Sequence, residues 1–359
     1  MTKFLSLLLL ICPTWAFATT YAPVHEQIIS QQMDRALVEA IATPRVVFET
    51  QHMELPQDME AMLMPFSEWW GIPISFGALA HALDSADVVL VGEHHEDPAT
   101  HRLELDISAA MHDNHEHDYY GHMLNIAMEM FERDQQDLLD DRFNDCGEDN
   151  EEDEELEETF LQAARLWSNY QRDYRPITEQ WRQSCSSQVV ASNAPTSISR
   201  RVAKEGIEAV LASLTTEERG WIAESTTAPR DDYWQRFLTA MGGGASADAH
   251  SSGMSEDTLY RYYQAQCLKD DTMAETIAAL READPQRQVV HLSGSFHIDY
   301  GLGIVPRLKQ RRPDDKIVTV AIRPVENFEE TTLQAALEAE PGVADYVVFV
   351  LKETVESGQ

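Results

Sequence analysis

A chain of 359 residues, of which 43% are hydrophobic and 25% are charged, has the composition of a folded globular protein and not of a disordered one. Its formal net charge of −35 at pH 7 disfavours nucleic acids and anionic membrane surfaces as partners, and it favours cations. The same charge also fits an adaptation to solubility or salt that involves no specific partner.

The first eighteen residues have the three parts of a secretory signal peptide. Lys3 supplies the positive start, residues 4–11 form a short apolar run, and residues 16–18 are a small-x-small cleavage site. Cys12 allows a second interpretation, lipid anchoring, but the bulky isoleucine before it favours cleavage after residue 18. No later run is apolar over the length of a membrane span. We therefore predict an exported, soluble protein of the periplasm or cell envelope.

Three cysteines remain after that cleavage: Cys146, Cys185 and Cys267. An exported protein allows one disulfide and one free thiol among them, and the sequence leaves the pairing open. The chain has no Cys-x-x-Cys, which argues against a thioredoxin-like centre and against a covalently attached c-type haem.

From about residue 86 short apolar runs alternate with helical patterns, which is typical of a mainly parallel central sheet flanked by helices. The predicted strands are residues 87–91, 124–128, 188–191, 288–292, 317–322 and 346–351. The clearest predicted helices are residues 98–112, with Asp97 as N-cap and Pro98 as first residue, and residues 256–282. The region before residue 86 is helical or irregular by pattern, with Trp69 and Trp70 as packing anchors.

Two segments interrupt this alternation. Residues 145–158 carry ten acidic side chains in fourteen, and they are interpreted as a solvated insert or a frayed helix start. Residues 242–253 are rich in glycine, serine and alanine and are interpreted as a loop. We predict one α/β domain over residues 19–355 that contains both segments.

Polar side chains follow four of the predicted strands at their carboxyl ends, where open α/β sheets bind ligands. These side chains are Glu93 with His95, Glu129, Asn193, and His297. Two of the four positions are Gly-x-x-His turns, residues 92–95 and residues 294–297, in which a glycine lets the backbone approach a ligand closely. One such residue alone is more often a cap or a turn residue. Their recurrence at the same strand ends predicts a site.

The chemistry of this set allows several uses. The two histidines can bind a metal or a haem iron, or they can exchange protons near neutral pH. The two carboxylates can ligate a cation, orient the imidazoles or act as general bases.

These segments resemble, in order, the motifs of the ChaN-like family of haem-binding uptake proteins, which belongs to the Tiki superfamily. The matching segments are residues 92–98 with His101, residues 129–136, Trp167 with residues 173–176, residues 193–195, residues 265–266 with Asp270 or Asp271 and residues 273–274, residues 294–297, and residues 301–306. The resemblance covers about residues 65–350. It implies an α/β fold with a central sheet and a haem-binding role in iron uptake at the cell envelope, with uptake proteins of the envelope as partners.

For haem, the resemblance and the residue chemistry leave the axial ligand open. The candidate ligands are His95, His297 and Tyr300; the candidate ring contacts are Phe296 and Phe131; and the candidate partners of the propionates are Arg307, Arg311 and Arg312. The same arginines also fit an ordinary basic helix end.

The superfamily also contains hydrolases, which gives an alternative. A divalent metal such as zinc would be held by His95, His297 and Glu93, and Glu93 or Glu129 would accept the proton of its water. The His-rich residues 112–122 are a third candidate, a zinc or copper scavenger, although a solvated loop explains them more simply. The aromatic residues Trp167, Trp181 and Tyr174 are interpreted as core. A homodimer is compatible with every alternative.

Overall fold

The computed structural model describes residues 45–49, 72–115, 124–144, 151–182, 187–242 and 254–353, without the side chains of residues 113–115 and 151–154. The predicted signal peptide, Cys12, Trp69, Trp70, Cys146, Cys185 and residues 116–122 of the His-rich segment lie outside the described residues. No helix among the described residues is long and apolar enough to cross a bilayer.

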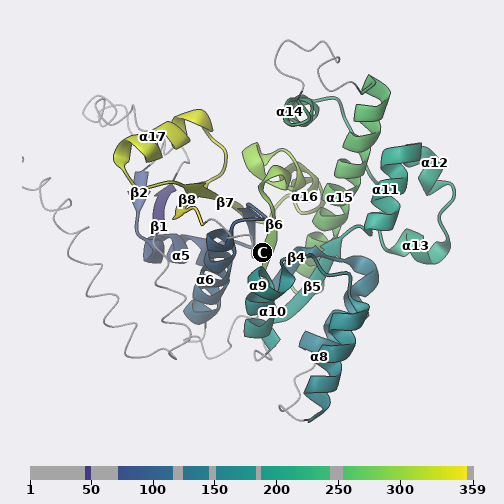
Figure 1. Cartoon of the computed structure of the whole chain (residues 1–359), viewed down its shortest axis with the longest axis horizontal. Helices are drawn as coiled ribbons and strands as arrows, with labels where there is room; N and C mark the ends of the chain where they lie inside the picture. Colours follow the sequence, from purple (N-terminus) through teal and green to yellow (C-terminus); the bar gives the residue numbers. More distant parts are fainter. Residues whose placement is uncertain are drawn as a thin grey trace, which may run out of the picture.

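The described residues form one eight-stranded sheet in the order β2-β1-β8-β7-β3-β6-β4-β5 (Figure 1). Its strands are β1 (Arg45–Glu49), β2 (Ile72–Ile74), β3 (Val88–Glu93), β4 (Leu124–Glu132), β5 (Gln188–Asn193), β6 (Gln288–Gly294), β7 (Ile317–Val325) and β8 (Tyr346–Leu351). From β8 to β5 every neighbouring pair is parallel, whereas β1 runs antiparallel to both β8 and β2. The predicted mainly parallel sheet is therefore confirmed, with each of the six predicted strands in place.

The prediction for the region before residue 86 was wrong in part. It contains the strands β1 and β2 as well as the helix α5 (Phe76–Asp84). β2 is only three residues long, and β1 gains its hydrogen bonds from β8, which lies about 300 residues later in the chain. Strands this short, paired over such a distance, leave no local periodicity to read.

Helices cover both faces of the sheet (Figure 1). One face packs against α5, α6 (Pro98–His115), α8 (Glu151–Ala163), α9 (Tyr170–Asp173) and α10 (Arg175–Arg182), and the other packs against α15 (Glu256–Ala283), α16 (Ile304–Arg311) and α17 (Glu330–Ala339). The remaining elements are η1 (Arg133–Gln135), α7 (Gln136–Leu139), η2 (Asp140–Asn144), α11 (Thr196–Glu205), α12 (Ile207–Leu211), α13 (Thr216–Gly220), α14 (Asp232–Ala240), η3 (Ser295–His297) and η4 (Asp299–Gly301).

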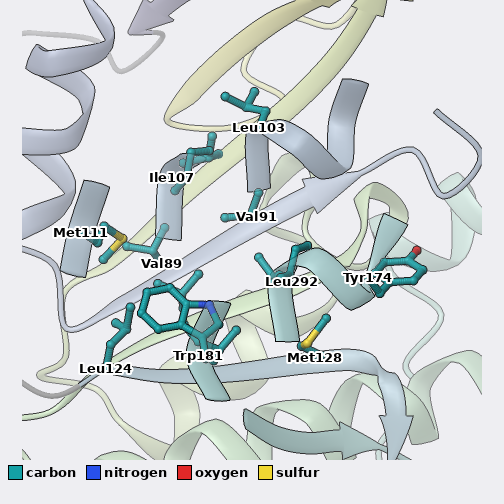
Figure 2. Close-up of a cluster of buried hydrophobic side chains, with 14 of the residues drawn as sticks. Val89, Val91, Leu103, Ile107, Met111, Leu124, Met128, Tyr174, Trp181 and Leu292 are labelled. Carbon is teal, nitrogen blue, oxygen red and sulfur yellow. The ribbon is translucent and has the colours of Figure 1, made fainter. Parts of the chain in front are cut away.

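Successive residues of the central strands point to opposite faces. Val89 and Val91 of β3 belong to the cluster on the α6 face, and Val88 and Leu90 belong to the cluster on the α15 face. A strand buried on both faces reads as a continuous apolar run, which is why β3 could be predicted correctly from the sequence. Figure 2 shows the α6-side cluster, in which Trp181 and Tyr174 are buried as predicted.

The predicted helix starts are also confirmed. Asp97 accepts hydrogen bonds from the amides of Ala99 and Thr100, and Pro98 is the first residue of α6. Residues 151–158 of the acidic segment form the start of α8, and residues 145–150 and 243–253 lie outside the described residues.

The parallel strands β3, β6, β4 and β5 end at one edge of the sheet. Glu93 at the end of β3 pairs in register with Gly294 at the end of β6. Between β4 and β5 the register shifts between Met128 and Glu132, so the chain around Glu129 departs from regular pairing. The polar residues predicted at the strand ends therefore lie at a common edge.

Candidate functional site

The two Gly-x-x-His turns touch each other. A Cβ atom built on Gly294 would lie 2.7 Å from both Cε1 and Nε2 of His95, so the imidazole of the first turn rests on the backbone of the second. Only a glycine leaves room for that contact. Gly303 packs equally closely against the end of the second turn, because a Cβ there would lie 2.1 Å from the carbonyl oxygen of His297.

His95 is held from one side and open on the other. Its Nδ1 hydrogen-bonds to Oε1 of Glu93, and its ring meets Trp167 edge to face at 4.8 Å between centroids. Its side chain is 39% exposed, in contrast with the fully buried side chain of Glu93. Burial would lower the pKa of His95, but the bond to Glu93 and the charge of that carboxylate raise it above its ordinary value.

His297 has the opposite surroundings. Its side chain is 6% exposed, its Nδ1 lies 2.6 Å from Oδ1 of Asp270, and its Nε2 lies 3.1 Å from Oε1 of Glu129. The side-chain amide of Gln266 faces the same ring. Burial would lower the pKa of His297, but the charges of Glu129 and Asp270 raise it to about 9.

This pKa predicts a dependence of stability on pH. Because the folded pKa of His297 lies above the unfolded value of 6.5, its contribution is complete below pH 6.5 and is lost as the pH rises through about 9. The expected loss of unfolding free energy over that window is on the order of 3 kcal/mol. Urea unfolding at pH 6.5 and pH 9 measures it, and His297→Gln is expected to lose less than the wild type. Equal losses in the two proteins contradict the assignment.

Two controls accompany that comparison. Burial would lower the pKa of His101, but its hydrogen bonds to Glu104 and Glu93 raise it to about 11. Its contribution to the pH dependence of stability is the same in both proteins and cancels in the difference between them. His94→Gln changes an exposed histidine of the same turn and is expected to keep the wild-type dependence on pH.

Glu129 joins the two turns to the strands. Its Oε2 accepts the amide of Gly294 at 2.9 Å, and its backbone oxygen accepts the side-chain amide of Asn193 at 3.0 Å. Burial would raise the pKa of Glu129, but the charge and hydrogen bond of His297 hold it well below its ordinary value. The side chain is therefore an ionised carboxylate that fixes both the backbone of the second turn and the imidazole of His297.

A second group of polar side chains lies behind Glu93. His101 Nδ1 is 3.3 Å from Oε2 of Glu93 and 3.0 Å from Oε2 of Glu104, and both carboxylates are buried. The hydroxyl of Tyr174 donates to Oε1 of Glu93 at 2.7 Å. Among the described residues, Glu93, His101 and Glu104 are the one group of three whose ligand atoms are spaced to hold a metal ion. The predicted set of His95, His297 and Glu93 is not gathered in this way.

The bond from Tyr174 gives a second stability prediction. Tyr174→Phe removes a donor to a buried carboxylate without changing the packed ring, and it is expected to lower the unfolding free energy by about 2 kcal/mol. The matched control is Tyr260→Phe, because the Tyr260 hydroxyl donates to the neutral carbonyl of Ala228. That change is expected to cost about 1 kcal/mol or less. Denaturant unfolding that gives equal losses for both variants rules out the charge-assisted bond.

The remaining haem candidates have distinct places. Tyr300 is half-buried, with a left-handed φ of 58°, and its amide donates to the carbonyl of Val343. Phe296 is half-buried and packs against Tyr233. The guanidinium of Arg236 lies over both rings, 5.1 Å from the centroid of Phe296 and 4.6 Å from that of Tyr300.

The predicted propionate partners and one ring contact are engaged elsewhere. Arg307 is buried, and its guanidinium donates to Asp271 and to the carbonyls of Gly303 and Thr227. Arg311 also pairs with Asp271, Arg312 pairs with Asp315, and Phe131 is buried among Phe160 and Tyr170. Of the arginines predicted from sequence, none is therefore free to meet an anionic ligand at the two turns.

Several residues that build the site had no predicted role in it. Glu104 had no predicted role. Trp167 and Tyr174 were interpreted as core, although both belong to a matched motif, and Gln266 and Asp270 were predicted only as parts of a motif. The signal for most of them was their place in the ordered motifs of the sequence. No spacing rule connects Trp167, Tyr174 or α15 to the strand ends before the fold is known.

The predicted cysteine chemistry is tested at one position. Cys267 is a free, buried thiol on α15. Burial raises the pKa of the Cys267 thiol, which makes it unreactive at neutral pH.

Residues 79–308 match a family model described as haem-binding uptake, Tiki superfamily, ChaN. The structure of cofacial haem binding to ChaN of Campylobacter jejuni is 18% identical, with a TM-score of 0.55 over 79% of this chain and 94% of that chain, which is a likeness of fold. A mutant of the erythromycin esterase EreC in its open conformation is 12% identical, with a TM-score of 0.42 over 87% of this chain and 99% of that one. No curated protein sequence matches this chain.

Proposed function

Because the chain belongs to the ChaN family of haem-binding uptake proteins in the Tiki superfamily, we propose that it binds haem where the two Gly-x-x-His turns meet and serves iron uptake at the cell envelope. The observation that carries the position of the site is the half-exposed imidazole of His95 on the backbone of Gly294. The family supports the ligand, and the geometry of this chain supports the place.

In this proposal His95 would hold the iron of a bound haem. Oε1 of Glu93 accepts a hydrogen bond from the Nδ1–H of His95, so Nε2 is the nitrogen with a lone pair. Nε2 has no hydrogen-bond partner among the described residues. A carboxylate behind an imidazole fixes its orientation and raises its basicity as a ligand. Haem, when bound, supplies the iron, and the protein supplies this oriented nitrogen.

His297 and Tyr300 have other roles. Both ring nitrogens of His297 face protein groups, Asp270 on one side and Glu129 on the other, so His297 positions the second turn. The ring of Tyr300 lies under the guanidinium of Arg236. Arg236 replaces Arg307 as the proposed partner of a propionate. Its Nη2 donates to Asp299, but its side chain is 24% exposed and lies over the rings of Phe296 and Tyr300, next to the two turns.

A haem titration tests this function. Haemin added to micromolar protein is expected to give a shifted Soret band that saturates at a fixed ratio of haem to protein. A spectrum equal to that of haemin in buffer, at every ratio, contradicts haem binding.

The metal-dependent hydrolase is the competing function. It needs His95, His297 and Glu93 around one cation, yet His297 is turned to Asp270 and Glu129. If this alternative holds, metal content depends on His297, and a chromogenic ester or peptide is turned over only by the metal-loaded protein. Haem binding without such turnover supports the first proposal.

Export is part of the proposal and rests on residues 1–18 alone. Fractionation of the expressing cells is expected to place the protein in the periplasm or at the envelope, shortened by about 18 residues. An intact amino terminus in the cytosolic fraction contradicts it.

A further inference from the structure

Behind the proposed haem ligand, the residues Glu93, His101 and Glu104 form a buried cluster that haem binding does not use directly. We propose that this cluster holds one divalent transition-metal cation, with Zn²⁺ and Mn²⁺ as the ions that its nitrogen and oxygen donors suit. The cation site goes beyond the proposed function, because it requires neither haem nor His297.

The donor atoms converge. The ligand atoms of the three residues all lie within 4.8 Å of one another, with the two carboxylates on either side of His101 Nδ1. Glu93 ends β3, whereas His101 and Glu104 lie one turn apart on α6, so three rigid positions present the donors. Such rigidity favours a fixed coordination geometry over a loose acidic patch.

The orientation of the His101 ring is that of a metal ligand. Its Nε2 lies 3.0 Å from the carbonyl oxygen of His95, and a carbonyl can only accept a hydrogen bond. Nε2 therefore bears a proton, and Nδ1 faces two carboxylate groups. A positive charge must lie there, either a proton or a metal ion. In protein metal sites, a histidine ligand commonly donates one ring N–H to a backbone carbonyl while its other ring nitrogen faces the metal.

The cluster contains two buried carboxylate oxygens that have no hydrogen-bond partner among the described residues. Oε2 of Glu93 and Oε1 of Glu104 accept no hydrogen bond from the described residues, although the residues are only 2% and 0% exposed. A buried carboxylate oxygen without a partner is costly, and a coordinated cation removes that cost for both side chains at once. These two oxygens belong to a pair of carboxylates already aimed at one imidazole nitrogen.

Among the described residues, His101 is the one basic side chain paired with Glu104. Asp173 lies 3.7 Å from His101 Nε2 and is paired with Arg172, and His95 and the Tyr174 hydroxyl are bound to the other oxygen of Glu93. None of these groups offers a positive charge to Glu104. Glu93 therefore links two sites, with Oε1 on the imidazole that faces haem and Oε2 on the proposed cation.

The test is metal analysis of haem-free protein purified without a polyhistidine tag. The wild type is expected to retain about one equivalent of divalent metal, or to take up one equivalent of Zn²⁺ or Mn²⁺ after treatment with a chelator. Co²⁺ added in place of these ions is expected to give visible bands that report nitrogen and oxygen ligands.

Variants separate this site from the alternatives. Glu104→Gln is expected to reduce bound metal at least tenfold, whereas His297→Gln and the triple variant H115A/H117A/H122A are expected to keep it. Metal that is lost in His297→Gln or in the triple variant, and kept in Glu104→Gln, overturns the proposal. None of these readouts involves haem, so a failed haem titration leaves the result for the cation unaffected.

If Glu104→Gln does not fold, the triple variant, which keeps the cluster intact, decides between the alternatives. Saturating Zn²⁺ or Mn²⁺ is expected to raise the Tm of the triple variant by about 5 °C, because a buried site binds metal only in the folded state. Metal content below about a tenth of an equivalent, together with an unchanged Tm, overturns the proposal.

Discussion

Replacing His95 with alanine is expected to weaken haem binding at least about 100-fold, because changes to the groups behind a metal ligand alone cost about 10–100-fold in affinity. His95 is the half-exposed imidazole whose Nδ1 is held by Glu93. Competition for haemin against a protein of known affinity measures the change, because the absorbance titration saturates when binding is tight. The fold is expected to persist, since His95 lies at the surface end of its turn.

His94→Ala is the matched control, since His94 is the preceding, exposed residue of the same turn. It is expected to keep wild-type affinity for haemin. Equal losses in the two variants, or a full Soret shift with wild-type affinity in His95→Ala, rule out His95 as the ligand.

The second large effect is expected from a single methyl group. In Gly294→Ala the new Cβ would lie 2.7 Å from two atoms of the His95 ring, so the imidazole must move off the second turn. We expect haem affinity to fall about tenfold or more, because a ligand displaced by a fraction of an ångström loses its orientation. The unfolding free energy is expected to fall by about 1–3 kcal/mol.

Gly220→Ala is the control for that substitution. A Cβ at Gly220 meets no atom within 4 Å, and its φ is not positive, so haem affinity and stability are expected to stay at the wild-type level. Wild-type haem affinity in Gly294→Ala means that the contact between the two turns is not needed for binding.

The central strands could be predicted from sequence because their signal is local. β3, with buried residues on both faces, reads as a continuous apolar run, and β6 reads as an apolar run interrupted by His291. Asp97 with Pro98 marks the start of α6. β1 and β2 gave no such signal, because β1 pairs with the distant strand β8 and β2 pairs with β1. Local patterning therefore predicted the parallel part of the sheet and missed its antiparallel edge.

The candidate site, like the fold, could be predicted from the sequence only in part. The position of Glu93, His95, Glu129 and His297 at one edge of the sheet could be predicted, because the carboxyl ends of parallel strands meet there. The different surroundings of the two histidines could not, because they depend on Asp270 of α15 and Trp167, which reach the turns only through tertiary packing. For the same reason Arg307 was predicted to meet an anionic ligand, although in the fold it pairs with Asp271 inside the protein.

The vibrational spectrum of the ferrous haem complex tests the central claim most directly, because it identifies the atom bound to iron. We predict an iron–nitrogen stretching band that shifts when the protein is labelled with ¹⁵N-histidine, persists in His297→Gln and is absent from His95→Ala. Phenolate bands in the ferric complex that disappear in Tyr300→Phe, with no band sensitive to labelled histidine in the ferrous form, would contradict the account.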